Sequence, residues 1–218
     1  MSFFAGKTMR TIMLDVDGVL VQGRPQDGAH LFTDLERDLG LSLEQLQSAF
    51  FKPRWAAIVT GQKALLPELT EVLATIAPHL SASTLIEYWF RNDSRIDQVV
   101  LAAVNSLRST GDRVYLATNQ EHMRASYLME TLGLKAHVDG IFYSAAIGHR
   151  KPAEAFYAHV TAAVAAPLAS ITLIDDTPEN VNAARQFGWT AIHWTPDMRV
   201  ADELAALDAA SAGAPHRA

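Results

Sequence analysis

The chain of 218 residues contains no cysteine, so it can form no disulfide and offers no thiolate ligand to a metal. It has no run that approaches the roughly 18 apolar residues of a membrane-spanning helix. The N-terminal stretch MSFFAGKTMR also lacks the apolar core of a signal peptide. These absences predict a soluble, cytoplasmic protein.

Positive charge is also scarce. Lysine and arginine together number 18 against 24 aspartates and glutamates, which gives a formal net charge of -6. Such a chain has no general basic field to attract nucleic acid or an anionic membrane, so we expect neither as a partner. An anionic substrate would need a cation at its own binding site.

Short apolar runs rich in β-branched and aromatic residues predict strands that are buried on both faces. Five such runs cover residues 11–14, 114–117, 141–143, 171–174 and 190–194. Segments with helical spacing lie between the later runs, at residues 96–107, 121–132, 153–165 and 177–188, and Asn92, Asp93 or Ser94 can cap the first of these helices. Strands that alternate with helices predict an α/β fold with a doubly wound parallel sheet, whose ligands bind at the carboxyl ends of the strands.

The stretch between the first two predicted strands is too long for an ordinary crossover. It has helical patterns over residues 31–39, 43–51, 63–76 and 83–90, and the second of these is expected to stop before Pro53. We therefore expect three parts in the chain. They are an α/β core over 8–20 and 93–200, an inserted all-helical cap over 21–92, and an Ala-rich tail over 201–218 whose last dozen residues are loosely ordered.

Acidic residues follow the first and fourth predicted strands. Asp15 and Asp17 are two residues apart, so an extended chain carries both carboxylates on one face. Close like charges raise a proton affinity or recruit a cation, although an isolated Asp-x-Asp-Gly is as often only a turn. Asp175 and Asp176 suit a hard, oxygen-seeking ion such as Mg²⁺, or one of them caps the next helix.

Polar residues of another kind follow the second and third strands. Thr118 and Asn119 offer a hydroxyl and free backbone N–H groups, which can hold a phosphoryl oxygen, or Thr118 is simply a helix N-cap. The compact ammonium of Lys151 suits a phosphate or a carboxylate. A lone lysine before proline is more often a solvated loop residue. Arg150 and His149 are alternative residues for a contact with an anion. Because the carboxyl ends of parallel strands lie at one edge of the sheet, the four clusters are predicted to form a single site.

In their order along the chain, the clusters resemble the four motifs of the haloacid-dehalogenase superfamily. The sequence reads DVDGV at 15–19, TN at 118–119, KP at 151–152 and DD at 175–176. The helical insertion is similar to the cap of that superfamily's first cap class, as in its subfamily IA-like phosphatases. The resemblance implies a Rossmann-like core, a Mg²⁺ cofactor and the hydrolysis of small phosphorylated metabolites, such as sugar phosphates or nucleotides.

The resemblance also implies a role for each catalytic residue. Asp15 would attack phosphorus and form an aspartyl-phosphate. Asp17 would protonate the leaving oxygen and later deprotonate the attacking water. Thr118 and the backbone of Asn119 would bind the transferring oxygens, and Lys151 would offset their charge and orient the nucleophile.

The metal ligands are implied in the same way. Asp15, Asp176 and the backbone carbonyl of Asp17 would hold Mg²⁺. Asp175 would be either a further ligand or the partner of a metal-bound water.

The motifs also have to be compared with those of other enzyme and protein classes. Members of the superfamily that cleave carbon–halogen bonds lack the second acid of the first motif, so Asp17 favours phosphoryl transfer. A phosphomutase would share every motif residue, and a phosphonate-cleaving relative would need a cap lysine such as Lys52 or Lys63. The order of the motifs disfavours a signalling receiver domain. The complete motif set disfavours a protein that only binds a phosphometabolite.

Contacts to the leaving group are expected from the insertion and from the residues that lead into it. The candidates are Arg54, Trp55, Gln62, Gln22 and Arg24. Trp55 is as readily a core residue of the cap, and Arg24 a solvated linker residue. The sequence does not identify the physiological substrate, and it is compatible with either a monomer or a homodimer.

Overall fold

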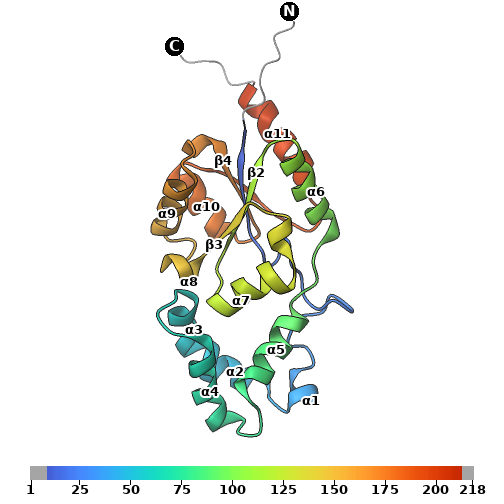
Figure 1. Cartoon of the computed structure of the whole chain (residues 1–218), viewed down its shortest axis with the longest axis vertical. Helices are drawn as coiled ribbons and strands as arrows, with labels where there is room; N and C mark the ends of the chain where they lie inside the picture. Colours follow the sequence, from blue (N-terminus) through green and yellow to red (C-terminus); the bar gives the residue numbers. More distant parts are fainter. Residues whose placement is uncertain (1–8, 213–218) are drawn as a thin grey trace, which may run out of the picture.

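A parallel five-stranded sheet forms the centre of the α/β part of the chain (Figure 1). The structure, a computed structural model, describes residues 9–212. The strand order is β3-β2-β1-β4-β5. The strands are β1 (Thr11–Leu14), β2 (Arg113–Thr118), β3 (Gly140–Tyr143), β4 (Ile171–Asp175) and β5 (Thr190–His193). All five predicted strands are therefore present, and the expected doubly wound parallel fold is confirmed.

Helices cover both faces of the sheet, because alternate residues of its strands point to opposite sides. On one face, Ile12 and Leu14 pack with residues of α6 (Gln98–Ser109) and α11 (Val200–Ala212). On the other face, Met13 packs with residues of α9 (Glu154–Val164) and α10 (Pro178–Phe187). Shorter elements complete the core: α7 (His122–Ser126), η2 (Tyr127–Thr131), η3 (Leu134–Ala136), α8 (Ser144–Ile147) and η4 (Leu168–Ser170).

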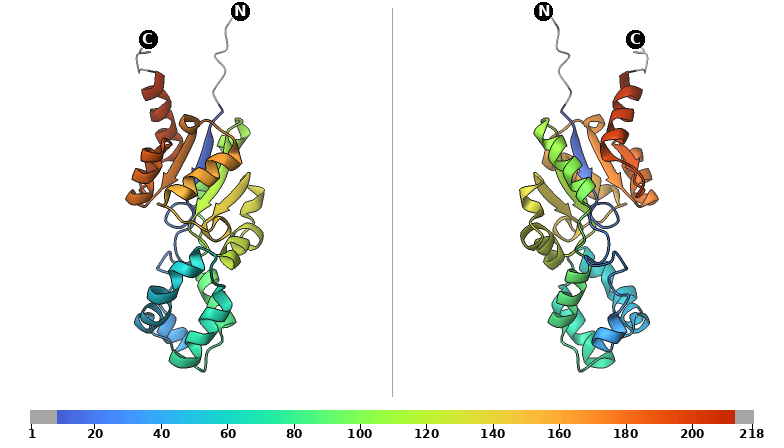
Figure 2. Two further views of the ribbon diagram at one scale, coloured as in Figure 1. Left: turned by 90° about the vertical axis from the view of Figure 1, so that its left-hand side faces the viewer. Right: turned by 90° about the vertical axis from the view of Figure 1, so that its right-hand side faces the viewer.

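The insertion between β1 and β2 is helical (Figure 2), and its buried apolar side chains form a core of their own. Its elements are α1 (Leu35–Leu39), α2 (Leu43–Leu46), the π-helical η1 (Gln47–Phe51), α3 (Lys52–Val59), α4 (Leu65–Ile76) and α5 (Ala82–Asn92). Buried Phe50, Ile58, Leu69 and Leu85 belong to this core. None of the helices described has the length and the apolar composition to cross a membrane.

Two local expectations fail in the helices. The helix does not stop before Pro53, because this proline lies in the first turn of α3, where a missing N–H is tolerated. α6 begins later than expected, since Asp97 rather than a residue at 92–94 caps it by accepting hydrogen bonds from the N–H groups of Val99 and Val100. Residues 93–97 instead join the helical insertion to the core.

The C-terminal segment begins as a helix that packs on the sheet. Helix α11 extends to Ala212, and buried Val200 and Leu204 belong to the apolar cluster on one face of the sheet. The Ala-rich tail predicted over 201–218 therefore begins as a helix, and the loose order of its last dozen residues stays a prediction. Residues 213–218 lie outside the described range.

The chain enters and leaves the helical insertion at one place. Val21 and Ile96 form an antiparallel bridge. The Gln22 N–H donates to the Arg95 carbonyl over 2.9 Å, and the Arg95 N–H donates to the Gly23 carbonyl over 3.1 Å. The two crossings therefore lie side by side, next to the carboxyl end of β1.

Candidate active site

The polar clusters found in the sequence meet at the sheet edge that faces the helical insertion (Figure 1). Strands β1 and β4 are paired in parallel with Leu14 beside Ile174, so the acids that follow them become neighbours. The Asp15 N–H donates to the Ile174 carbonyl over 2.9 Å. Ligand atoms of Asp15, Asp175 and Asp176 all lie within 4.8 Å of one another. We call these three residues the acid triad.

Lys151 lies beside the acid triad. Its side chain is fully buried, and Nζ lies 3.1 Å from Oδ1 of Asp15 and 2.5 Å from Oδ2 of Asp175. Burial disfavours the charged ammonium, but the two carboxylates outweigh this effect and raise the pKa of Lys151 above its ordinary value. Lys151 is therefore a cation, and the expectation of a solvated loop lysine does not apply. Its rivals His149 and Arg150 are both exposed.

Asn119 fixes the backbone of Lys151. Its Oδ1 accepts from the Lys151 N–H over 2.9 Å, and its Nδ2 donates to the Lys151 carbonyl over 3.0 Å. The neighbouring Thr118 is only 1% exposed. No residue in the described part of the chain hydrogen bonds to the Thr118 hydroxyl. That hydroxyl is available to an anion at the end of β2.

The acid triad carries more negative charge than Lys151 compensates. Burial raises the pKa of Asp15 to about 7; Lys151 opposes this shift, while Asp175 and Asp17 add to it. Burial and the charge of Asp175 also raise the pKa of Asp176. A divalent cation among these oxygens would relieve the repulsion, and carboxylate oxygens are the ligands that Mg²⁺ prefers.

Gly18 leaves the space that the Asp176 carboxylate occupies. Its φ is +81°, and a Cβ at this position would lie 2.1 Å from Oδ2 of Asp176. Any other residue would displace the carboxylate from the triad. The triad and this glycine together fit a bound metal ion.

The two acids that follow β4 have different surroundings. Asp175 is fully buried, and its Oδ1 accepts from the Thr177 N–H over 2.9 Å and from Asn180 Nδ2 over 3.0 Å. Because Lys151 also contacts Oδ2, both oxygens of the Asp175 carboxylate already have partners within the protein. Asp176 instead lines a cleft of about 390 Å³ beside the triad. Asp176 is thus the more accessible ligand of the pair.

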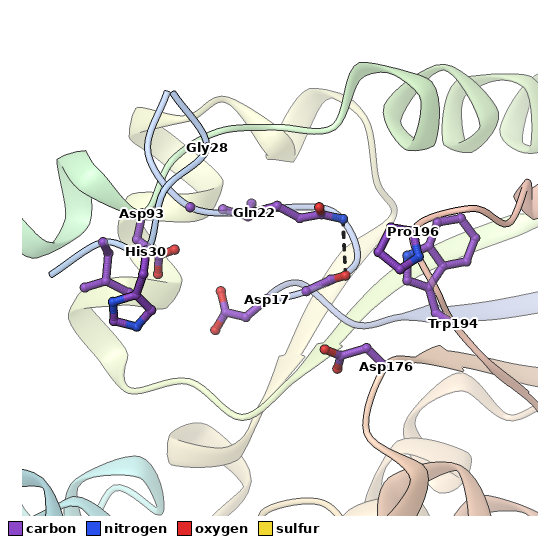
Figure 3. A pocket seen from close by; sticks show the side chains of 12 residues that line it. Asp17, Gln22, Gly28, His30, Asp93, Asp176, Trp194 and Pro196 are labelled. Carbon is purple, nitrogen blue, oxygen red and sulfur yellow. Dashed lines mark hydrogen bonds between the residues drawn. The ribbon is translucent and has the colours of Figure 1, made fainter. Parts of the chain in front are cut away.

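The Asp17 carboxylate points into this cleft, apart from the acid triad (Figure 3). Its side chain is 53% exposed, and Oδ2 accepts a hydrogen bond from Gln120 Nε2 over 2.6 Å. Partial desolvation by the cleft walls raises its pKa, which Arg124 and Gln120 counteract. Asp17 is thus placed to exchange a proton with a molecule in the cleft.

Arg124 connects this acid to the helical insertion. The arginine is buried, and its Nη2 lies 4.0 Å from Oδ1 of Asp17 and 3.2 Å from Oδ2 of Asp93. Nη1 donates to the Phe90 carbonyl at the end of α5 over 3.3 Å. Burial and the charge of Asp17 raise the pKa of Asp93 to about 6, although the positive charge of Arg124 acts to lower it.

The residues that were expected to contact the leaving group differ in their surroundings. Arg54 pairs with Glu68 and Glu71, and Lys63 also pairs with Glu68. Gln22 lines the cleft, with Nε2 donating to the Gly18 carbonyl over 3.3 Å (Figure 3).

Arg24 departs from its expectation of a solvated linker residue. It is only 7% exposed, and it is paired with Asp27 and Asp34. Its role is therefore to hold the segment that leads into the insertion.

Sequence reasoning missed Gln120 and Arg124. Gln120 directly follows Thr118 and Asn119, and this adjacency to a motif was its one available signal. Arg124 lies a helical turn further along and belongs to no motif. Asp93 was noted only as a possible helix cap, yet it contacts Arg124 and lines the cleft.

Three comparisons with known proteins agree on the kind of protein that this chain resembles. A family model described as haloacid dehalogenase-like hydrolase matches residues 9–188. A sesquiterpene phosphatase, AstK from Aspergillus oryzae, is 28% identical over 205 residues, which are 92% of this chain and 97% of the relative.

Two solved structures have the same fold. The HAD family enzyme BT-2542 from Bacteroides thetaiotaomicron, in complex with magnesium and inorganic phosphate, has a TM-score of 0.76 at 12% identity and covers 90% of this chain and 99% of its own. A HAD-like family hydrolase from Porphyromonas gingivalis has a TM-score of 0.74 at 19% identity, with coverage of 92% and 98%.

Proposed function

Because this chain belongs to the haloacid dehalogenase-like hydrolases, we propose that it is a Mg²⁺-dependent phosphatase that hydrolyses small phosphate monoesters through an aspartyl-phosphate on Asp15. The observation that carries the proposal is the separation of its acids. Asp15 lies in the acid triad beside Lys151. Asp17 instead lies in the open cleft, where it accepts a hydrogen bond from Gln120. Two carboxylates in different surroundings can serve as nucleophile and proton carrier.

Two further points support phosphate rather than halide as the target. Carbon–halogen cleavage needs no acid at the position of Asp17, and here that side chain has dedicated partners in Gln120 and Arg124. The relative from Aspergillus oryzae is a sesquiterpene phosphatase, and BT-2542 was solved with inorganic phosphate.

The proposed metal site consists of Asp15, Asp176 and the backbone carbonyl of Asp17. When bound, Mg²⁺ would screen the repulsion between a carboxylate nucleophile and an anionic substrate. We assign Asp175 to a supporting role, because Lys151, Thr177 and Asn180 already engage its oxygens. In that role it holds Lys151 and the start of α10 in place.

In the first step, a carboxylate oxygen of Asp15 attacks phosphorus while the bond from phosphorus to the leaving oxygen breaks. Lys151 and the Val16 N–H both contact Oδ1 of Asp15, which fixes the orientation of the carboxylate. Asp17 gives its proton to the leaving oxygen, so the product departs as a neutral alcohol.

In the second step, Asp17 takes a proton from a water molecule that attacks the aspartyl-phosphate. The bond between Asp15 and phosphorus breaks, which frees the enzyme and inorganic phosphate. Thr118 and the Asn119 backbone would bind the transferring oxygens, and Lys151 would offset their charge. The raised pKa of Asp17 suits both of its tasks.

A direct test uses the purified full chain with p-nitrophenyl phosphate and a panel of phosphorylated metabolites. We expect Mg²⁺-dependent release of inorganic phosphate that stops with EDTA. Asp15→Asn and Asp17→Asn should each lower kcat by a factor of about 10³ or more, since each removes a reacting group. A phosphomutase would instead return the phosphate to a substrate carbon skeleton without releasing it.

Two results would contradict the proposal at different levels. If the wild type leaves the whole panel untouched, the chain is not a phosphatase of this kind. If Asp15→Asn keeps full activity, the covalent mechanism is wrong although the activity stands.

A further inference from the structure

The helical insertion contains a second cavity, of about 580 Å³, which we call the aromatic cavity. Its walls include Phe32, Phe51, Trp55 and Trp89, together with Leu31 and Leu43. The rings contact one another: the Phe51 centroid lies 5.6 Å from that of Trp55 and 5.4 Å from that of Trp89. The cavity has the volume of a site for a small organic molecule.

The aromatic cavity adjoins the cleft that is lined by Asp17 and Asp176. His30 and Leu31 line both spaces. Asp17 and Asp176 line the same cleft, with Asp17 between His30 and Pro196 (Figure 3). A substrate whose phosphate binds at the acid triad can therefore extend past His30 into the insertion.

The rings at this cavity do more than fill the core of the insertion. Phe32 and Trp89 are almost fully buried, at 6% and 8% exposed, but Phe51 and Trp55 are only half-buried. Phe51 and Gln47 belong to the π-helical turn η1, and such turns are frequent at functional sites. The insertion thus leaves apolar surface open where its own core could have closed over it.

The chemistry of the cavity walls limits what can bind there. Among the described lining residues, the polar side chains are His30, Gln47 and Lys52, and only Lys52 carries a full charge. A sugar or a nucleoside would find only these three polar side chains for its several hydroxyl groups, and each hydroxyl group that is buried against the rings without a partner is costly. An apolar chain loses nothing by leaving water and gains by each methylene that it buries.

We infer that the substrates are phosphate esters of long-chain apolar alcohols, with the phosphate at the acid triad and the chain in the aromatic cavity. This inference rests on the proposed function and names its substrate class. Phe51 and Trp55 are the residues that would determine specificity, because they present open aromatic surface to the chain.

The test measures kcat/KM for two series of phosphate monoesters, each below its micelle-forming concentration. One series has straight alkyl chains of four, eight and twelve carbons, and the other has isoprenoid chains of ten and fifteen carbons. p-Nitrophenyl phosphate serves as the reference without a chain. We expect kcat/KM to rise about threefold for each of the first added methylenes, mainly through KM, and to level off once the cavity is filled.

Two substitutions and one control locate the effect. Phe51→Ala and Trp55→Ala should flatten the dependence of kcat/KM on chain length. The control is Leu66→Ala, which truncates a 40%-exposed leucine on α4, away from the aromatic cavity. It should keep the full dependence on chain length.

A binding measurement keeps the test independent of turnover and of misfolding. Trp55 and Trp89 line the cavity, so dodecanol or farnesol should change the tryptophan fluorescence of the wild type in a saturable way. Trp55→Phe keeps an aromatic wall and should bind these alcohols with a smaller signal. A preference for one alcohol over the other distinguishes isoprenoid from straight-chain substrates.

The outcomes separate this inference from the proposed function. If p-nitrophenyl phosphate is hydrolysed but kcat/KM does not depend on chain length, the substrate class is wrong and the phosphatase stands. If no ester is hydrolysed at all while the alcohols still bind, the phosphatase proposal fails and the apolar site stands. If neither alcohol binds, the inference is overturned.

Discussion

Gln120 Nε2 donates a hydrogen bond to Oδ2 of Asp17 over 2.6 Å, although the two residues lie 103 positions apart in the chain. The bond joins the loop after β2 to the loop after β1. It stabilises the charged form of Asp17 and so opposes the increase in its pKa that burial causes. The interaction gives the proposed proton carrier a fixed orientation and a tuned proton affinity.

Gln120→Leu should therefore raise the pKa of Asp17 further. If Asp17 must be protonated to release the alcohol, activity declines as pH rises through this pKa. The alkaline limb of the kcat/KM profile should then move to higher pH, and kcat should fall about tenfold because the side chain loses its orientation. A pH–rate profile from pH 5 to 9 measures both effects.

Gln186→Leu is the matched control for this substitution. It removes an exposed glutamine from α10, and it should leave the profile unchanged. An unshifted alkaline limb in Gln120→Leu would show that Asp17 does not limit the reaction in this way.

Lys151→Met should destabilise the fold by about 3–5 kcal/mol at neutral pH, since it leaves Asp15 and Asp175 buried without a cation. In this variant Asp15 loses the charge that lowers its pKa, so its folded-state pKa rises and the lost stability should return in part as pH falls and Asp15 takes up a proton. Denaturant unfolding at several pH values measures this.

The control for Lys151→Met is Lys135→Met. This change breaks an exposed ion pair with Glu130 and should alter stability by less than about 1 kcal/mol. Equal losses of stability in the two variants would contradict the assigned role of Lys151.

Asp93→Asn should stabilise the protein above pH 6. The pKa of Asp93 is raised to about 6, so the folded state binds a proton more tightly than the unfolded state, and stability falls as pH rises from about 4 to 6. A neutral side chain removes that loss, by about 1–3 kcal/mol at pH 7.

Thermal unfolding between pH 4 and 8 would show a flatter profile for Asp93→Asn than for the wild type. Glu87→Gln, which changes an exposed acid on α5, is the matched control. A variant that loses stability at pH 7 would mean that the pair with Arg124 outweighs the cost of burying Asp93.

Gly18→Ala should weaken Mg²⁺ binding by at least about tenfold, because the new Cβ would meet Oδ2 of Asp176. In the wild type, saturating Mg²⁺ should raise the unfolding temperature, since the ion binds the folded acid triad. Gly18→Ala should show little of this increase, as measured by thermal unfolding with and without Mg²⁺.

Gly133→Ala separates the clash from backbone strain. Its φ of +74° is close to the +81° of Gly18, but a Cβ there has nothing within 4 Å. Both variants should lose about 1–2 kcal/mol from the left-handed conformation, yet only Gly18→Ala should lose the response to Mg²⁺. A full Mg²⁺ response in Gly18→Ala would rule out Asp176 as a ligand in this position.

The strands and the motif clusters could be predicted because each depends on a short stretch of sequence. Buried parallel strands are nearly continuous apolar runs, and their carboxyl ends share one edge of the sheet. Asp15, Thr118, Lys151 and Asp175 therefore meet wherever the strand order allows it. Helix ends were less predictable: Pro53 reads as a stop, yet it fits the first turn of α3.

The remaining features depend on contacts between distant segments. Arg124 belongs to no motif, and its function follows only from its proximity to Asp17 and Asp93. The aromatic residues of the insertion could be recognised as apolar, but sequence alone does not show that Phe51 and Trp55 stay half-exposed around a cavity. The position of the C-terminal helix likewise depends on distant segments, because Val200 and Leu204 pack in the apolar cluster on one face of the sheet.

The bridge between Val21 and Ile96 makes the helical insertion a cassette with both of its ends at one point. About 70 residues lie between these two crossings, and they can be exchanged without altering the order of the strands if the contacts of the insertion with the core are kept, such as the hydrogen bonds from Ser144 to the Val59 carbonyl and from Arg124 to the Phe90 carbonyl. In this architecture the acid triad stays with the core when the insertion is exchanged. A new substrate preference can therefore be acquired separately, by recombination or by design, through replacement of the cassette.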